Sequence, residues 1–279
     1  MHGPSRYRMM RSDTVVRRHT EGKAMSTLVL PNASFAGKVA LVTGGSAGIG
    51  RATARAFAEA GATVVLSDID AEGGEAVAQE LRDSGSETAF IRADVSQAAD
   101  VARLVAETVA RYGRIDCAHN NAGILGGVAL LADVAEDEFD RLMSVNLKGV
   151  WLCLKEEIVQ MQRQGGGGSI VNTASIAGLR GTAWLPIYSA SKHGVVGLTR
   201  AAALAYAGDG IRVNAVCPGY VDTAMVTDTP LLLARAGERT PMGRLVSPEE
   251  IAMAVVWLCS DTAAIMTGEM MVIDGGVSV

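Results

Sequence analysis

Short apolar runs alternate with longer, helix-length stretches from Lys38 to the carboxyl terminus. Most of the short runs are continuously apolar rather than alternating, which is typical of strands in a parallel sheet that is covered on both faces. Seven strands are predicted, at residues 39–42, 63–67, 89–92, 115–119, 169–173, 212–216 and 271–273. Helices are predicted between them, at 49–60, 71–84, 97–112, 136–162, 188–208 and 247–259.

This order of elements predicts an α/β fold: a single-domain, Rossmann-like, doubly wound parallel sheet of about seven strands with helices on both faces. The last helix has a clear start, because Ser247 suits the N-cap, Pro248 the first helical position and Glu250 the capping box. The longest stretch without a predicted element is about 223–246, which is long enough to form a mobile lid over a site.

The composition fits one large domain. Of 279 residues, 49% are hydrophobic, which is ample for a sizeable core, and seven strands with their helices leave no room for a second domain. The 32 glycines make up about 11% of the 279 residues, whereas an average protein contains about 7% glycine. We therefore expect glycine at tight turns and where the backbone approaches a ligand.

Several classes of protein are excluded by composition. The longest apolar runs, such as 251–259, are far shorter than the ~20 residues that span a bilayer, and the amino terminus lacks the apolar stretch of a secretory signal. The net charge of −5 argues against nucleic acid as the main partner. The cysteines have no metal-ligand spacing, which predicts reduced thiols in a cytoplasmic protein without a metal site. They are Cys117, Cys153, Cys217 and Cys259.

The amino-terminal segment differs from the rest in charge. Residues 1–24 carry six basic and two acidic residues, a net charge of +4, so the other 255 residues carry −9. We predict that 1–35 is a basic, flexible extension and that 36–279 is the folded domain. The extension is interpreted as an over-long start preceding Met25, as a native flexible segment, or as a transit peptide. The last is disfavoured by its acidic residues and the absence of an amphipathic helix.

A glycine-rich turn follows the first predicted strand and opens the first helix. Its glycines, Gly44, Gly48 and Gly50, have the spacing GxxxGxG, and Ser46, Ala47 and Ile49 lie between them. Such a turn lets the backbone approach a pyrophosphate, whose charge meets the helix N-terminus. A purely structural turn is the alternative, but the end of the first strand is where such sheets bind nucleotides.

Polar residues at the next strand ends extend this predicted nucleotide site. Asp68 ends the second strand, where a carboxylate accepts both ribose hydroxyls of an adenosine and repels a 2′-phosphate. Ala47 and Ile69 supply no Arg or Lys for a phosphate, so NAD(H) is expected rather than NADP(H). The third strand is followed by Asp94 and Val95, which are candidates for holding the adenine. The fourth ends in Asn120, Asn121, Ala122 and Gly123, whose amides can satisfy strand-end backbone groups beside the cofactor.

Acid–base chemistry is indicated by Ser175, Tyr188 and Lys192. Tyr188 and Lys192 are four residues apart and share one helix face. An ammonium group near a phenol lowers its pKa from ~10, which makes tyrosine usable as an acid or base. Ser175 closes the fifth predicted strand at the same sheet edge. A surface tyrosine–lysine pair is the alternative, and the combination with Ser175 and the nucleotide loop argues against it.

Taken together, these motifs resemble those of the short-chain dehydrogenase/reductases. The resemblance runs from about residue 37 to residue 279, and the motifs occur in the family's order. They are Thr43-Gly44-x3-Gly48-x-Gly50, Asn120-Asn121-Ala122-Gly123, Asn146, Ser175, Tyr188-x3-Lys192 and Pro218-Gly219.

The resemblance implies an NAD-dependent oxidoreductase acting on CH–OH groups. Tyr188 would be the general acid/base, Lys192 would lower its pKa and bind the nicotinamide ribose, and Ser175 would polarise the substrate carbonyl. Asn146, in the helix 136–162, would hold a water that links Lys192 to solvent. Pro218, Gly219, Val221 and Thr223 would border the nicotinamide. The resemblance also implies a homotetramer, and the Ala, Val and Leu of helices 136–162 and 188–208 fit such an assembly.

Three other functions remain open at this point. A non-catalytic dinucleotide-binding protein is expected to lack Tyr188 or Lys192, and both are present. A lyase or epimerase usually needs a larger C-terminal substrate domain. A 3-oxoacyl thioester reductase of the same fold usually prefers NADPH and needs a basic docking patch.

The residues that follow the catalytic motifs predict the substrate. Leu125, Ala177, Leu185, Tyr220 and Met225 are expected to line its pocket, joined by Ile124, Leu179, Trp184 and 231–233. None is charged, so a neutral, mainly apolar secondary alcohol or its ketone, including cyclic ones, is expected. A carboxylate would lose hydration without finding a cation, because Arg180 and Arg235 are expected to face solvent.

Overall fold

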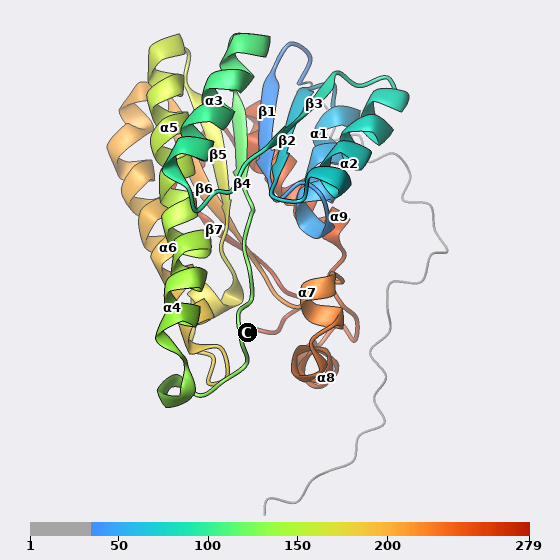
Figure 1. The fold of residues 1–279 in the computed structure, drawn as a ribbon, viewed down its shortest axis with the longest axis vertical. Helices are drawn as coiled ribbons and strands as arrows, with labels where there is room; N and C mark the ends of the chain where they lie inside the picture. The colour runs from blue at the N-terminus through green and yellow to red at the C-terminus, as the bar shows by residue number, and fades with distance from the viewer. Residues whose placement is uncertain (1–34) are drawn as a thin grey trace, which may run out of the picture.

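The computed structural model of the chain describes residues 35–279, and its centre is a parallel sheet of seven strands (Figure 1). The strands are β1 (Val39–Thr43), β2 (Thr63–Asp68), β3 (Thr88–Arg92), β4 (Cys117–Asn120), β5 (Gly168–Thr173), β6 (Ile211–Pro218) and β7 (Met270–Ile273). They lie in the order β3-β2-β1-β4-β5-β6-β7, and every neighbouring pair is parallel. The predicted doubly wound α/β fold is therefore confirmed. The basic segment 1–24 and Met25 lie outside the described residues.

Six of the nine helices among the described residues form two layers, one on each face of this sheet, and the bounds of all nine follow. They are α1 (Gly48–Glu59), α2 (Ala71–Asp83), α3 (Ala98–Tyr112), α4 (Glu136–Met143), α5 (Gly149–Gln164), α6 (Pro186–Tyr206), α7 (Ala224–Thr227), α8 (Pro230–Arg239) and α9 (Pro248–Cys259). Figure 1 shows α3, α5 and α6 on one face and α1, α2 and α9 on the other. Ser247 and Glu250 form the predicted capping box at the start of α9.

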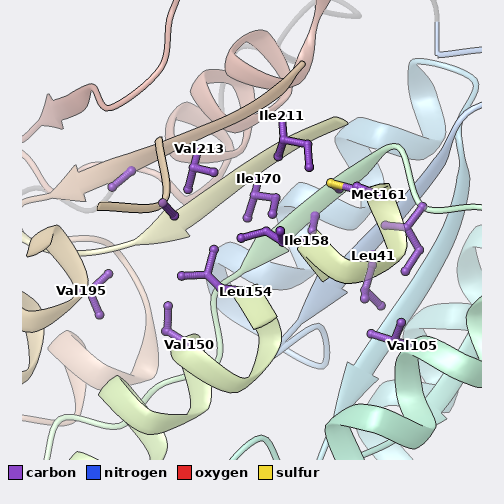
Figure 2. Packing of buried hydrophobic residues seen from close by; sticks show 14 of the residues in the cluster. Leu41, Val105, Val150, Leu154, Ile158, Met161, Ile170, Val195, Ile211 and Val213 are labelled. Carbon is purple, nitrogen blue, oxygen red and sulfur yellow. The ribbon is translucent and has the colours of Figure 1, made fainter. Parts of the chain in front are cut away.

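The core under α3, α5 and α6 is aliphatic. Val150, Leu154 and Ile158 recur every fourth residue along α5, so they share one face and pack on Ile170 of β5 and Val213 of β6 (Figure 2). Burying each such side chain contributes ~1.5–3 kcal/mol. A core packed on both faces holds the sheet rigid and fixes where the carboxyl ends of its strands point.

Phe35, the first described residue, already belongs to the opposite core. It is 1% exposed, and its ring meets that of Phe57 in α1 edge-on, with centroids 5.4 Å apart. The Phe35 N–H also donates to the Ala60 carbonyl. The folded domain therefore includes residue 35.

The helix predicted over 136–162 is helical throughout, from Glu136 to Gln164, but its hydrogen-bonding pattern changes in the middle. A turn of π-helix, η2 (Ser144–Lys148), separates α4 from α5. Asn146, in this turn, is fully buried and holds both backbone groups of Ile124: its Oδ1 accepts the N–H and its Nδ2 donates to the carbonyl, each at 2.8 Å. The wider turn fits a side chain that is tied to a neighbouring loop rather than to its own helix.

The segment 223–246 is not irregular throughout. It contains α7 and α8, which lie beyond the carboxyl ends of the strands (Figure 1). Pro230 opens α8, and Leu232 and Ala236 are buried on its inner face. Burial of these two apolar side chains against the rest of the fold stabilises a helix that is too short to be recognised from periodicity.

Within residues 35–279, no helix is long and apolar enough to cross a membrane. All four cysteines are free and buried.

Candidate active site

A cavity of about 850 Å³ opens at the carboxyl edge of the sheet, around the point where the strand order reverses between β1 and β4. Loops that follow β1 through β6 line it, and α7 and α8 cover one side. A parallel sheet binds ligands at such a switch point, because the loops on either side diverge there.

The glycine-rich turn forms one end of this cavity. Gly44 and Gly48 adopt positive φ values of 67° and 51°, which side chains rarely tolerate. A Cβ atom on Gly50 would lie 1.9 Å from the Gly44 carbonyl oxygen, so only glycine lets α1 begin so close to the turn. No side chain caps α1, and its first N–H groups are left for an anion such as a pyrophosphate.

Asp68 lies beside this turn and is held by it. The Ser46 N–H and hydroxyl donate to Asp68 Oδ2 at 3.1 and 2.7 Å, and the Asp70 N–H donates to Oδ1 at 3.1 Å. Arg92, at the end of β3, is directly opposite Asp68 in the sheet register, and its Nε donates to the Ile69 carbonyl. Ala47 and Ile69 supply no cation, but Arg92, which is distant in sequence, lies beside Asp68 in the neighbouring strand.

The two asparagines at the carboxyl end of β4 make different contacts. Asn121 Nδ2 donates to the carbonyls of Thr43 and Gly44, which joins β4 to the glycine-rich turn as predicted. Asn120 points instead into the core, where its Nδ2 donates to Glu157 Oε2 at 2.9 Å. The cavity is lined at this end by Gly44, Ser46, Ala47, Gly48, Ile49, Asp68, Ile69, Asp94, Val95, Asn121, Ala122 and Gly123.

Tyr188 and Lys192 lie on one face of α6 and both reach the cavity. The Lys192 ammonium nitrogen is 5.6 Å from the centre of the Tyr188 ring and donates to the Thr173 carbonyl at 2.7 Å. Ser175 also lines the cavity, two residues beyond the end of β5 rather than within it, and its Oγ accepts the Ala177 N–H. The three predicted catalytic side chains therefore converge on one wall.

The pKa of Tyr188 does not follow the prediction. Burial raises the pKa of the phenol, and a hydrogen bond with Ser175 opposes this rise only in part. Burial also lowers the pKa of Lys192 to about 8. Both shifts have the same cause, because a low-dielectric surrounding disfavours the charged form of each group. Sequence spacing revealed the pair but not the depth at which it is buried.

Asn146 and Gly50 lie beneath residues that line the cavity and do not line it themselves. A Cβ atom on Gly123 would lie 3.2 Å from Asn146 Oδ1 and 3.6 Å from Lys192 Nζ. The loop after β4 therefore packs closely against the side chains of Asn146 and Lys192 at Gly123.

The far end of the cavity is mainly apolar. Leu232, Ala236 and Leu185 form a small buried cluster against which Tyr188 and Tyr220 pack. All the predicted pocket residues line it except Leu179 and Leu233. The lining residues are Ile124, Leu125, Ala177, Trp184, Leu185, Tyr220, Met225, Leu231 and Leu232, and Pro218, Gly219, Val221 and Thr223 lie between the two ends.

Arginine side chains also line the cavity, which corrects a further expectation. Arg180 and Arg235 were expected to face solvent, but both border the cavity, as do Arg141 and Arg239. Arg239 lies in the segment 223–246, for which the sequence predicts no helix, so its position on a helical face could not be predicted. Among residues 35–279, no group of His, Cys, Asp and Glu is arranged to hold a metal ion.

Known proteins are similar to this chain in sequence. A family model described as Enoyl-(Acyl carrier protein) reductase matches residues 44–278. The chain is 45% identical to cis-4-hydroxycyclohexanecarboxylate dehydrogenase of Sinomonas cyclohexanicum over 87% of its length and 97% of that protein's. It is 42% identical to cyclohexanol dehydrogenase of Acinetobacter sp. (strain SE19), over 86% and 95%.

A solved structure is similar to this chain in fold. The crystal structure of a short-chain type dehydrogenase/reductase from Mycobacterium marinum superposes with a TM-score of 0.85 at 37% identity, covering 88% of this chain and 97% of that one. Matches of this extent in sequence and in fold show that the chain belongs to the short-chain dehydrogenase/reductase family of oxidoreductases.

Proposed function

We propose that the protein interconverts secondary alcohols on mainly apolar, cyclic carbon skeletons with their ketones, using NAD(H). One observation carries this proposal: Tyr188 and Ser175 lie where the nucleotide end and the apolar end of a single cavity meet. Relatives named for cyclohexanol and for a hydroxycyclohexanecarboxylate support a ring alcohol.

The residues around the glycine-rich turn fit a nicotinamide dinucleotide. The uncapped start of α1 would hold the pyrophosphate, and Asp68 would accept the hydroxyls of the adenosine ribose. When bound, the cofactor supplies the hydride acceptor for oxidation and the hydride donor for reduction. Asp68 favours NAD(H), because a carboxylate repels a 2′-phosphate, whereas Arg92 in the neighbouring strand would attract one.

Tyr188 would take the hydroxyl proton during alcohol oxidation and return it during ketone reduction. Burial raises the pKa of the phenol, whereas the Ser175 hydrogen bond and the nearby Lys192 charge favour the phenolate that accepts this proton. Ser175 would orient the substrate oxygen. Lys192, fixed by the Thr173 carbonyl, would bind the nicotinamide ribose, and Asn146 would position a water for proton exchange with solvent.

We further propose that the enzyme works as a homotetramer in the cytoplasm. Trp151 of α5 is 47% exposed and Leu204 of α6 is 86% exposed on the outer helical layer, and large apolar side chains of this kind favour burial against another subunit. The four free cysteines fit a reducing compartment.

The function is tested by a substrate panel read by NADH absorbance. Cyclohexanol, a free sugar and a 3-oxoacyl thioester are compared with NAD(H) and with NADP(H), by kcat/KM. We expect the ring alcohol with NAD to exceed the other two substrates at least tenfold. A thioester or sugar that exceeds the ring alcohol tenfold overturns the proposal.

A further inference from the structure

The cavity separates acidic from basic side chains. Its acidic residues, Asp68 and Asp94, follow β2 and β3 at the nucleotide end. Its arginines lie on other segments, and no other acidic residue among the described ones lines the cavity. These arginines are Arg141 of α4, Arg180 after η3 (Ile176–Gly178), and Arg235 and Arg239 of α8. The substrate end is therefore apolar but electropositive.

Two of these arginines already have partners. Arg141 makes a two-pronged contact with Glu138, at 2.8 and 3.0 Å, and Arg180 Nη1 donates to the Val277 carbonyl at 2.9 Å. Arg235 and Arg239 make no hydrogen bond or ion pair with any residue in the range 35–279. Arg235 is also half-buried, so part of its hydration is lost without replacement.

Arg235 lies on the face of α8 that lines the cavity. Leu231, Arg235 and Arg239 are spaced four residues apart, and all three line the cavity together with Leu232. Leu232 packs in the cluster that contacts Tyr188. The same helix face thus presents an apolar surface near the catalytic tyrosine and cationic groups one and two turns beyond it.

We propose that Arg235, assisted by Arg239, binds a carboxylate carried by the alcohol substrate at the end remote from the reacting carbon. This inference rests on the proposed function and adds a second recognition element to it. A guanidinium group binds a carboxylate through two parallel hydrogen bonds, which offsets the loss of hydration that the apolar wall imposes. Neutral ring alcohols remain substrates, and the carboxylate adds affinity.

The test compares cis-4-hydroxycyclohexanecarboxylate with its methyl ester, which has the same ring and hydroxyl group but no negative charge. We expect the wild-type enzyme to favour the acid over the ester at least tenfold in kcat/KM. Arg235→Gln lowers that acid-to-ester ratio at least tenfold, mainly through the KM of the acid, and Arg239→Gln lowers it about threefold. Arg163→Gln, at an exposed position of α5 outside the cavity, leaves the ratio unchanged.

A second readout does not depend on turnover. Cyclohexanecarboxylate lacks the reacting hydroxyl, and its inhibition constant against a neutral alcohol should rise at least tenfold in Arg235→Gln. The Kd of NADH, measured by fluorescence titration, shows whether Arg235 binds the substrate or the cofactor. In Arg235→Gln it should stay within threefold of the wild-type value.

The possible results distinguish failure of the carboxylate site from failure of the proposed function. Acid-to-ester ratios within twofold of wild type in both α8 variants, with the ester still oxidised, overturn the carboxylate site and leave the proposed function standing. Weaker NADH binding, together with an equal loss of kcat/KM for the acid and the ester, would show that the arginines bind the cofactor. That result also overturns the carboxylate site. If the wild-type enzyme oxidises neither ring alcohol, the proposed function fails and the inference fails with it.

Discussion

The Lys192 ammonium lies 5.6 Å from the centre of the Tyr188 ring while donating to the Thr173 carbonyl at 2.7 Å. The charge is therefore anchored to the end of β5 and not to the phenol itself. It acts on Tyr188 through space, and the low pKa of Lys192, about 8, places its loss of charge just above neutral pH.

Removing this charge should shift the pH dependence of alcohol oxidation. Oxidation requires the deprotonated phenol, so kcat/KM rises with pH, and an adjacent ammonium moves that rise to lower pH. Lys192→Met should move the midpoint upward by at least one pH unit and lower the rate at pH 7 by at least ~10²-fold. Lys155→Met, at an exposed lysine of α5 paired with Glu156, serves as the control. A profile that keeps its midpoint in Lys192→Met contradicts the prediction.

Asp68 should determine the choice between NAD and NADP. Asp68→Ser removes the repulsion of a 2′-phosphate and leaves Arg92, opposite in the register, able to attract it. The ratio of kcat/KM for NAD over NADP should fall at least ~10-fold, as expected for removal of one charge interaction. Adding Arg92→Gln to this variant should reverse the gain with NADP. A wild-type enzyme that uses both cofactors equally argues against the role given to Asp68.

Gly50→Ala should weaken cofactor binding. Its Cβ atom would lie 1.9 Å from the Gly44 carbonyl oxygen, so the glycine-rich turn must move. We expect the Kd of NADH to rise at least tenfold. Gly197→Ala is the matched control, because nothing lies within 4 Å of its Cβ position in α6. That substitution should raise the stability by ~0.5–1 kcal/mol, since alanine favours helix. Normal NADH binding by Gly50→Ala is the contrary result.

Glu157 should make stability depend on pH. Burial raises the pKa of this carboxyl to about 7 from an ordinary value of 4.5. Between these values the folded protein binds a proton that the unfolded chain releases, so stability falls as pH rises through this window. Glu157→Gln removes this titratable group. The free energy of unfolding of the variant minus that of the wild type should therefore be larger at pH 8 than at pH 5, by up to about 3 kcal/mol.

Urea unfolding of both proteins at the two pH values measures this difference. Glu156→Gln, at the neighbouring position that pairs with Lys155 at the surface, should show no such pH dependence. An equal difference between Glu157→Gln and wild type at both pH values contradicts the prediction.

The strands could be predicted from sequence because both of their faces are buried. Continuous apolar runs as short as those of β1 and β2 are typical of such strands, and all seven strands are predicted to within a few residues. The glycine-rich turn and the Tyr188–Lys192 pair could also be predicted, since local backbone geometry and helical spacing fix them.

What the sequence could not reveal depends on contacts between distant segments. The π-turn at Asn146 depends on Ile124, and Arg92 meets Asp68 only through the sheet register. The arginines of α8 enter the cavity because Leu232 and Ala236 are buried, which periodicity over ten residues cannot establish. The pKa of Tyr188 likewise depends on burial by the whole fold.

The proton transfer by Tyr188 is tested most directly by the rate of NADH formation in Tyr188→Phe, with the best ring alcohol of the panel. The substitution removes only the phenolic oxygen from a ring that stays packed beside Leu232 and Tyr220. We predict that the rate falls by ~10²–10⁴-fold, the usual contribution of a general acid or base. The Kd of NADH should remain within threefold. A variant that keeps half of the wild-type rate would show that the hydroxyl proton leaves by another group and would contradict the mechanism.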